Sequence, residues 1–200
     1  MALMISEEHL PATLTVPPMT DDEFVAFCEN YPDCFVEVTA DGEVIIMPPN
    51  YSLTSARGSN IVVALGTWAK RDGRGIATDS CGGFVLPNGA RRAPDAAWTS
   101  RTKLATLTPS QTEGFWRLGP DFVIELRSTH DRLRTIRAKM AEWIDNGAKL
   151  GWMIDPKTRT VEVYRPNLPV EIVSNVQEIV GGSPVDGFVL DLEEIWNPLG

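Results

Sequence analysis

Residues 121–127, Asp-Phe-Val-Ile-Glu-Leu-Arg, constrain the fold more than any other segment of the chain. Side chains alternate between the two faces of a β-strand, so the phenylalanine, isoleucine and leucine share one face, which must be buried. The other face brings Asp121, Glu125 and Arg127 together around one valine. Such a face can hold a divalent cation beside a fixed positive charge. An exposed sheet face with an ordinary Glu–Arg ion pair is the alternative interpretation.

A helix is expected soon after this strand, over about residues 131–146. Apolar residues recur there at spacings of three and four, as in a helix packed on a sheet, and Gly147 ends the pattern. These residues are Leu133, Ile136, Met140, Trp143 and Ile144. Residues 150–155 predict another strand, which turns at Asp155-Pro156 into a hairpin. The tail predicts short strands and a last turn near residues 192–196.

The N-terminal part predicts a short helix followed by a hairpin. Thr20 and Glu23 have the spacing of a capping box, so we expect a helix over about residues 21–30. Residues 35–49 predict a hairpin, because Asp41-Gly42 supplies the positive φ angles of a tight turn between β-branched residues.

A long helix over about residues 53–72 comes next, with four apolar residues on one face. They are Ile61, Leu65, Trp68 and Ala69. We then expect a strand near residues 75–79 and a second hairpin around Asn88-Gly89 whose far arm carries Asp95. A short helix near residues 101–107 and a polar loop should lead from there to the strand at 121–127. Hairpins combined with two long helices predict an α/β fold with a mixed sheet.

The chain has 200 residues, which suits one compact domain over residues 1–200. Residues 1–20 contain three prolines and are expected to form an irregular arm. No apolar run reaches the ~18 residues of a membrane helix, and the N-terminus lacks the basic start and apolar stretch of a secretory signal. The three cysteines show no CxxC spacing, which predicts reduced thiols in a cytoplasmic protein.

The formal net charge of -9 argues against casual nucleic-acid binding. The charge is uneven, however: residues 91–139 carry ten Arg or Lys and five Asp or Glu, and the rest of the chain is strongly acidic. A locally basic middle segment can face a polyanion. A solvated helix face with several arginines explains the same pattern.

Asp95 is the second candidate acid. It follows Pro94 in an otherwise apolar strand, where β propensity disfavours aspartate, so another feature should compensate it. If its strand pairs with residues 121–127, Asp95 and Glu125 converge on one site. Carboxylates without a histidine cluster favour Mg²⁺ or Mn²⁺ over zinc. A turn or capping role is the alternative for Asp95.

Four further residues are weaker candidates. Glu37 and Glu43 flank the first hairpin turn and each offers a carboxylate, although hairpin glutamates are usually solvated. Lys139 lies at the margin of the apolar stripe of its helix, from which its ammonium can reach the sheet edge. Lysines also occupy such margins without a function. His130 is expected in a loop or first helical turn rather than as a ligand.

Three segments together resemble a known family. They are Ala-Pro-Asp-Ala-Ala-Trp at 93–98, Pro-Asp-Phe-Val-Ile-Glu-Leu-Arg-Ser at 120–128, and residues 146–166 after the helix that carries Lys139. They resemble the Uma-type restriction endonuclease family, which is assigned to the PD-(D/E)XK nuclease superfamily. The similarity extends over about residues 35–196. It implies a restriction-endonuclease-like fold, with a central mixed β-sheet and β-hairpins flanked by helices.

The resemblance also implies roles for individual residues. Asp95 matches the acid on the superfamily's first motif strand and Glu125 the acid of the (D/E)XK element, and both would bind the metal. Arg127 stands where the motif has lysine, and arginine keeps the charge but cannot become a neutral base. Lys139 matches the family's lysine on the following helix. Glu43 matches a glutamate of the family's first hairpin that would complete the metal site.

The implied function is hydrolysis of DNA phosphodiester bonds with Mg²⁺ or Mn²⁺, in which Asp95, Glu125, Arg127 and Lys139 are the catalytic residues. RNA is a second candidate substrate, no membrane partner is expected, and a homodimer would supply two active sites for a duplex. The alternative is a catalytically impaired nuclease-fold protein that acts as a nucleic-acid or protein binding module. Arg127 and the acidic net charge favour that alternative.

Overall fold

The computed structural model of the chain describes residues 11–17, 19–129 and 131–199. Its helices are α1 (Asp21–Glu29), α2 (Ser52–Asp72), α3 (Arg101–Leu104), α4 (Pro109–Thr112), α5 (Leu133–Asp145) and α6 (Glu193–Trp196). Its strands are β1 (Ala12–Thr15), β2 (Phe35–Val38), β3 (Glu43–Met47), β4 (Gly75–Asp79), β5 (Phe84–Val85), β6 (Arg91–Arg92), β7 (Ala96–Ser100), β8 (Phe122–Leu126), β9 (Leu150–Asp155), β10 (Thr160–Tyr164), β11 (Glu171–Ser174), β12 (Glu178–Val180) and β13 (Val189–Asp191).

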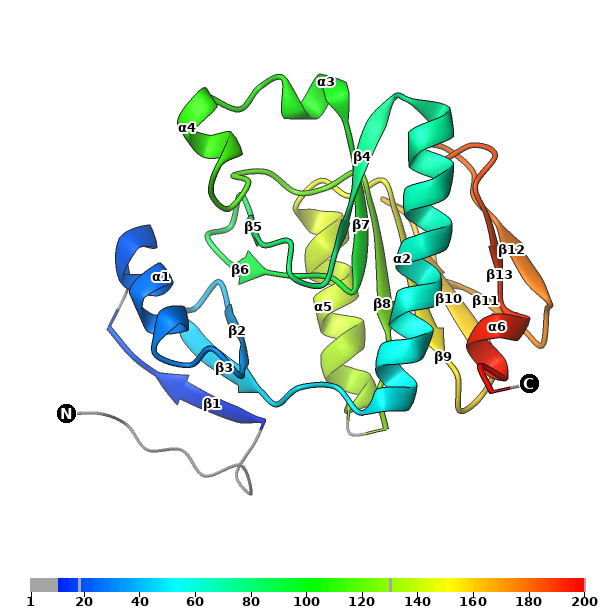
Figure 1. Cartoon of the computed structure of the whole chain (residues 1–200), viewed down its shortest axis with the longest axis horizontal. Coiled ribbons are helices and arrows are strands. Elements are labelled where there is room, and N and C mark those ends of the chain that lie inside the picture. Colours follow the sequence, from blue (N-terminus) through cyan, green and yellow to red (C-terminus); the bar gives the residue numbers. More distant parts are fainter. Residues whose placement is uncertain (1–10, 18, 130, 200) are drawn as a thin grey trace.

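A six-stranded mixed sheet is the centre of the molecule (Figure 1). Its strand order is β11-β10-β9-β8-β7-β4. β8 and β9 are parallel and are joined by α5, whereas the other neighbours are antiparallel. The predicted mixed α/β sheet with hairpins and flanking helices is therefore confirmed. None of the helices in the described part of the chain is long and apolar enough to cross a membrane.

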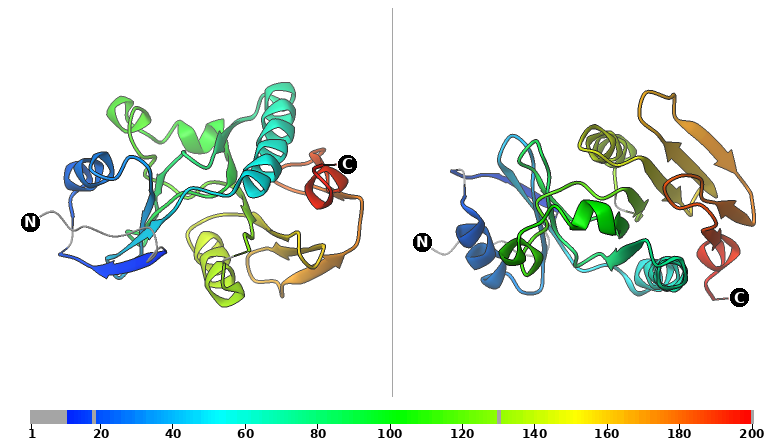
Figure 2. Two further views of the ribbon diagram at one scale, coloured as in Figure 1. Left: turned by 60° about the horizontal axis from the view of Figure 1, so that its bottom comes forward. Right: turned by 90° about the horizontal axis from the view of Figure 1, so that it is seen from above.

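The two long helices cover opposite faces of this sheet, as Figure 2 shows. Ile61 and Leu65 of α2 pack with the even-numbered residues of β8 in one core. Met140 and Trp143 of α5 pack with Val123 of β8 in the other core. The alternation expected for residues 121–127 is thus confirmed, and it directs Glu125 toward α5.

A glycine in β9 lets α5 approach the sheet closely. A Cβ added at Gly151 would lie 2.5 Å from Cε of Met140 and 3.3 Å from Cγ2 of Val123. A larger residue would therefore require the flexible end of the Met140 side chain to move. The close approach matters because Lys139 precedes Met140 on α5 and must reach the strands below.

A smaller sheet with strand order β1-β3-β2-β6-β5 lies beside the central sheet, on the side of α1 (Figure 1). α1 begins with the predicted capping box between Thr20 and Glu23. Phe24 of α1 packs on Val38 of β2 and Val44 of β3 in a third core. Because side chains alternate along β2, Glu37 points away from this core and toward the central sheet.

Three sequence-based expectations need correction. Residues 1–20 are not an irregular arm throughout, because β1 pairs with β3 and Ala12 lies opposite Ile46; residues 1–10 lie outside the described residues. The second hairpin is only two residue pairs long, and Asp95 lies after it, just before β7. Pro109–Thr112 forms a helical turn, α4, where a polar loop was expected.

Candidate active site

The ammonium of Lys139 is the centre of a buried polar cluster between the two sheets. Its Nζ lies 2.8 Å from Oε1 of Glu37 and 2.9 Å from Oε1 of Glu125. It also donates a hydrogen bond of 2.9 Å to the backbone carbonyl of Ala93. Burial alone would lower the pKa of Lys139, but Glu125 and Glu37 outweigh burial, so the pKa is raised and the side chain stays charged.

Glu125 lies on the α5 face of β8 and only 4% of its surface is exposed. Trp143 Nε1 donates a hydrogen bond of 2.7 Å to Oε1 of Glu125, and Lys139 Nζ donates one of 3.2 Å to Oε2. Burial raises the pKa of Glu125 to about 8; the Lys139 ammonium opposes this rise, and the Asp95 and Glu37 carboxylates add to it. A cation beside Glu125 would therefore stabilise its ionised form.

Asp95 stands at the entry to β7, next to Glu125. The register pairs Ala96 with Ile124, so one further step places Asp95 opposite Glu125. The backbone N–H of Leu126 donates a hydrogen bond of 2.6 Å to Oδ2 of Asp95. Burial raises the pKa of Asp95, and the Leu126 amide and Lys139 offset this only in part. Oδ1 accepts no hydrogen bond from the described residues.

Both carboxylate oxygens of Glu37 contact protein donors. Arg92 donates to its Oε2 at 3.0 Å, and the amide of Ala93 donates to its Oε1 at 3.1 Å. Burial alone would raise the pKa of Glu37, but Lys139 and Arg92 outweigh burial and lower it. Arg92 also pairs with Glu142 of α5, at 2.6 Å. These contacts join the small sheet, the central sheet and α5 at one point.

Arg127 lies beyond the end of β8 and makes other contacts. Its Nη1 is 2.6 Å from Oδ2 of Asp155, and its Nε donates to the carbonyl of Asp131 at 3.3 Å. The amide of Ser128 donates to the carboxylate of Asp131 at 2.7 Å. Asp131 lies close enough to Asp95 to raise the pKa of that acid further. Arg127 is thus anchored at the edge of the cluster rather than paired with Glu125.

The cluster has an excess of negative charge. Three carboxylates, those of Glu37, Asp95 and Glu125, share the charges of Lys139 and Arg92. Arg92 is further shared with Glu142. The positive charges of Lys139 and Arg92 mainly offset the negative charge of Glu37. The carboxylates of Asp95 and Glu125 are offset less completely, which agrees with the raised pKa values of these two acids.

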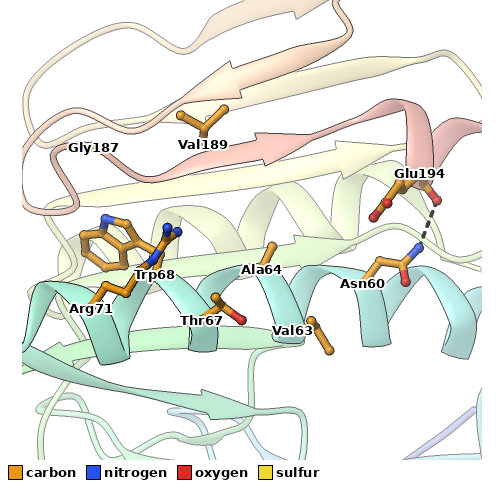
Figure 3. A pocket seen from close by; sticks show the side chains of 9 residues that line it. All are labelled: Asn60, Val63, Ala64, Thr67, Trp68, Arg71, Gly187, Val189 and Glu194. Carbon is orange, nitrogen blue, oxygen red and sulfur yellow. Dashed lines mark hydrogen bonds between the residues drawn. The ribbon is translucent and has the colours of Figure 1, made fainter.

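A groove of about 380 Å³ lies elsewhere, between α2 and β13 (Figure 3). Val63 of α2 and Val189 of β13 line it, and Asn60 bridges the two sides through a hydrogen bond of 3.2 Å to the carbonyl of Glu194. Since α2 and α5 cover opposite faces of the sheet, this groove is separate from the Lys139 cluster.

The comparison with known proteins agrees with this geometry. A family model described as "Uma2: Putative restriction endonuclease" matches residues 21–193. The chain belongs to the Uma2 family. The family resemblance expected from residues 93–98, 120–128 and 146–166 is therefore confirmed. No curated protein matches this Uma2 chain.

A solved structure has the same fold as this Uma2 protein. It comes from Anabaena variabilis ATCC 29413 and is described as a putative nuclease belonging to DUF820. The two chains are 22% identical, with a TM-score of 0.73, and the match covers 90% of this chain and 98% of the other. This similarity confirms the restriction-endonuclease-like fold.

The donor set of the Uma2 cluster suits Mg²⁺ or Mn²⁺ with few protein ligands. Within the described ranges, no group of three or more His, Cys, Asp or Glu side chains could hold a metal ion. Mg²⁺ is commonly held by only one or two carboxylates, with water and substrate phosphates as its other ligands. Asp95 and Glu125, which lie opposite each other beside Lys139, would be those two carboxylates.

The structure brings together three of the predicted site residues, Asp95, Glu125 and Lys139. Glu43 is exposed at the start of β3, and the carboxylates that contact Lys139 in the described chain are Glu37 and Glu125. The metal role of Glu43 therefore stays a prediction. His130 lies outside the described residues.

Two members of the cluster could not be assigned roles from the sequence. Trp143 was expected only as a core residue of α5, yet its indole N–H holds Glu125. Asp131 was expected only as the start of a helix. Glu37 did carry a signal, because it alternates with Val36 and Val38 and so lies on the face opposite to their core.

Proposed function

We propose that this protein is a metal-dependent nuclease that hydrolyses phosphodiester bonds in DNA. The observation that carries the proposal is that Asp95 lies opposite Glu125 in the strand register and that Glu125 contacts the ammonium of Lys139, whose charge also acts on Asp95. Membership of the Uma2 family supports it. Two acids beside a lysine are suited to binding a phosphodiester group together with a divalent cation.

Each residue has a distinct part in this proposal. Asp95 and Glu125 would hold the divalent ion, which when bound lowers the pKa of a coordinated water and polarises the phosphoryl oxygen. Lys139 stays protonated and offsets the negative charge that develops on the phosphoryl group. Trp143 fixes the rotamer of Glu125 by a hydrogen bond. Arg127 lies at the rim, where its guanidinium would contact an adjacent phosphate of the strand.

The substrate is expected to be double-stranded DNA, with RNA as the second candidate. Contacts of Arg and Lys side chains with phosphates release counterions, so binding, and with it cleavage at low substrate concentration, should fall as salt rises. Cleavage of both strands would need two sites, which is why we expect a homodimer on the DNA. Analytical ultracentrifugation of the protein with and without a short duplex measures its oligomeric state.

Asp95→Asn and Glu125→Gln test the proposed site. Each removes a carboxylate charge while keeping side-chain size, so cleavage of supercoiled plasmid in Mg²⁺ or Mn²⁺ should fall by about 10²-fold or more. The melting temperature should stay the same or rise, because a poorly compensated buried charge is lost. Glu171→Gln, an exposed acid on β11 of the same sheet, is the matched control. Unchanged cleavage in both site variants would exclude this site.

A binding module without turnover is the second candidate function. The observation that favours it is Arg127, which stands in the place of the motif lysine and is engaged by Asp155 and Asp131. If the protein is only a binding module, the wild-type chain and the Glu125→Gln variant should bind a labelled duplex equally tightly. The wild-type chain should then cleave neither plasmid DNA nor single-stranded RNA with Mg²⁺ or Mn²⁺.

A further inference from the structure

Glu37 forms a closed ring of contacts with Lys139 and Ala93. Oε1 of Glu37 lies 2.8 Å from Nζ of Lys139 and accepts a hydrogen bond of 3.1 Å from the amide of Ala93. The carbonyl of Ala93 in turn accepts a hydrogen bond of 2.9 Å from the same Nζ. Each member of the ring touches the other two, so the lysine ammonium cannot move without breaking two contacts.

This ring bears on both halves of the proposed site. The ammonium of Lys139 contacts Glu37 as well as Glu125, so a change at Glu37 would alter where the ammonium rests against Glu125. Ala93 lies two residues before Asp95, so the ring also fixes the segment that presents Asp95 beside Glu125. Arg92 holds the other oxygen of Glu37 at 3.0 Å, which stops the carboxylate from rotating away.

Glu37 belongs to neither motif strand. It comes from β2 in the small sheet, and only 4% of its surface is exposed. Val38 packs in the core beneath α1, which turns Glu37 toward α5. The small sheet therefore contributes a side chain to the cluster, and the central sheet alone would leave Lys139 with a single carboxylate partner.

We propose that Glu37 is a positioning residue of the active site, which holds the ammonium of Lys139 against Glu125 and fixes the Ala93–Asp95 segment. The inference rests on the proposed nuclease function for the use made of Lys139. Both oxygens of Glu37 are already engaged by protein donors, Oε1 by Lys139 and Ala93 and Oε2 by Arg92. In this proposal Glu37 acts through Lys139, whose ammonium it contacts directly, and it lies on β2 rather than on β8 or the segment that carries Asp95.

The first test needs no activity and uses the metal-free full-length chain. The side-chain Nζ signal of Lys139 is recorded in a ¹⁵N–¹H correlation spectrum and assigned by its loss in Lys139→Met. Glu37→Gln keeps the size of the side chain but removes its charge, so this signal should shift and broaden as the ammonium exchanges faster with water. Glu37→Asp, which keeps the charge with a shorter reach, should give a smaller change and serves if the glutamine variant does not fold.

Glu142→Gln is the matched control, because Glu142 also pairs with Arg92 but makes no contact with Lys139 in the described chain. It should leave the Lys139 signal in place. An unchanged signal in both Glu37 variants would overturn the proposal. So would an equal change in Glu142→Gln, since Glu37 would then act only through Arg92.

The second test measures cleavage. A misplaced lysine should lower kcat by about 10- to 100-fold with little effect on KM, because the ammonium serves the transition state. Glu142→Gln should keep kcat. A Glu37→Gln variant with normal kcat would contradict the proposal. If the wild-type chain cleaves nothing, the proposed function fails, and the Lys139 signal alone still decides the role of Glu37.

Discussion

At the scale of single residues, the cluster around Lys139 places three acids beside only two basic side chains. Burial, with a smaller effect from the Asp95 and Glu37 carboxylates, raises the pKa of Glu125 to about 8, whereas Lys139 and Arg92 lower the pKa of Glu37. A buried acid that is raised this far destabilises the folded state once it ionises. The divalent cation proposed above would offset this negative charge.

The raised pKa of Glu125 predicts a pH dependence of stability in the metal-free protein. In the unfolded chain Glu125 has the ordinary glutamate pKa of 4.5, whereas in the folded chain its pKa is about 8. Its contribution to stability is thus fully present below pH 4.5 and is lost as the pH rises toward 8. Glu125→Gln should therefore gain stability relative to wild type over this window, by a few kcal/mol in total.

Urea unfolding of both proteins with EDTA, from about pH 5 to about pH 8.5, measures this difference. A difference in the free energy of unfolding that stays constant over the whole range would show that the folded and unfolded pKa values of Glu125 are equal.

At the scale of elements, the position of Lys139 depends on how α5 ends as well as on how it packs. Gly119, in the segment before β8, lies under the C-terminus of α5. A Cβ added there would come within 2.2 Å of the backbone carbonyl oxygen of Asn146. Backbone cannot rotate away as a side chain can, so the end of the helix would have to move.

Gly119→Ala is therefore expected to destabilise the protein by roughly 1–3 kcal/mol. Gly114→Ala is the control, because a Cβ at exposed Gly114 meets nothing within 4 Å. Thermal or urea unfolding compares the two variants. Equal stability of Gly119→Ala and wild type would mean that the segment before β8 can move to accommodate the added methyl group without lowering the free energy of unfolding.

Much of the element order follows from local patterns in the sequence. The capping box of Thr20, the apolar face of α2 and the alternation in β8 each act over a few residues, so they could be predicted. The pairing of β1 with β3 and the split into two sheets depend on contacts between distant segments, which no local pattern encodes. The same reason explains why Glu125 was found but the roles of Trp143 and Asp131 were not.

At the scale of the whole molecule, the two sheets meet at the site. The contacts of Lys139 with Glu37 and of Arg92 with Glu142 and Glu37 link the small sheet to α5 and the central sheet. The strands β5 and β6 also connect the two, because Phe84 of β5 packs in the same core as Trp143. The single domain expected over residues 1–200 stays a prediction, which unfolding experiments can test.

A single domain predicts one cooperative unfolding transition. Scanning calorimetry should show one peak whose calorimetric and van't Hoff enthalpies agree. Arg92→Met would leave Glu37 and Glu142 without their shared cation and should lower the melting temperature of that one peak. Two separate peaks in the wild-type protein would instead indicate that the small sheet unfolds on its own.

We propose above that Asp95 and Glu125 together bind a divalent ion beside Lys139. Crystals soaked in millimolar Mn²⁺ test it most directly, because anomalous scattering locates manganese without ambiguity. We expect one anomalous peak between the two carboxylates, about 2 Å from an oxygen of each, that is absent from Glu125→Gln crystals. Soaked wild-type crystals with no peak at that position would contradict the account.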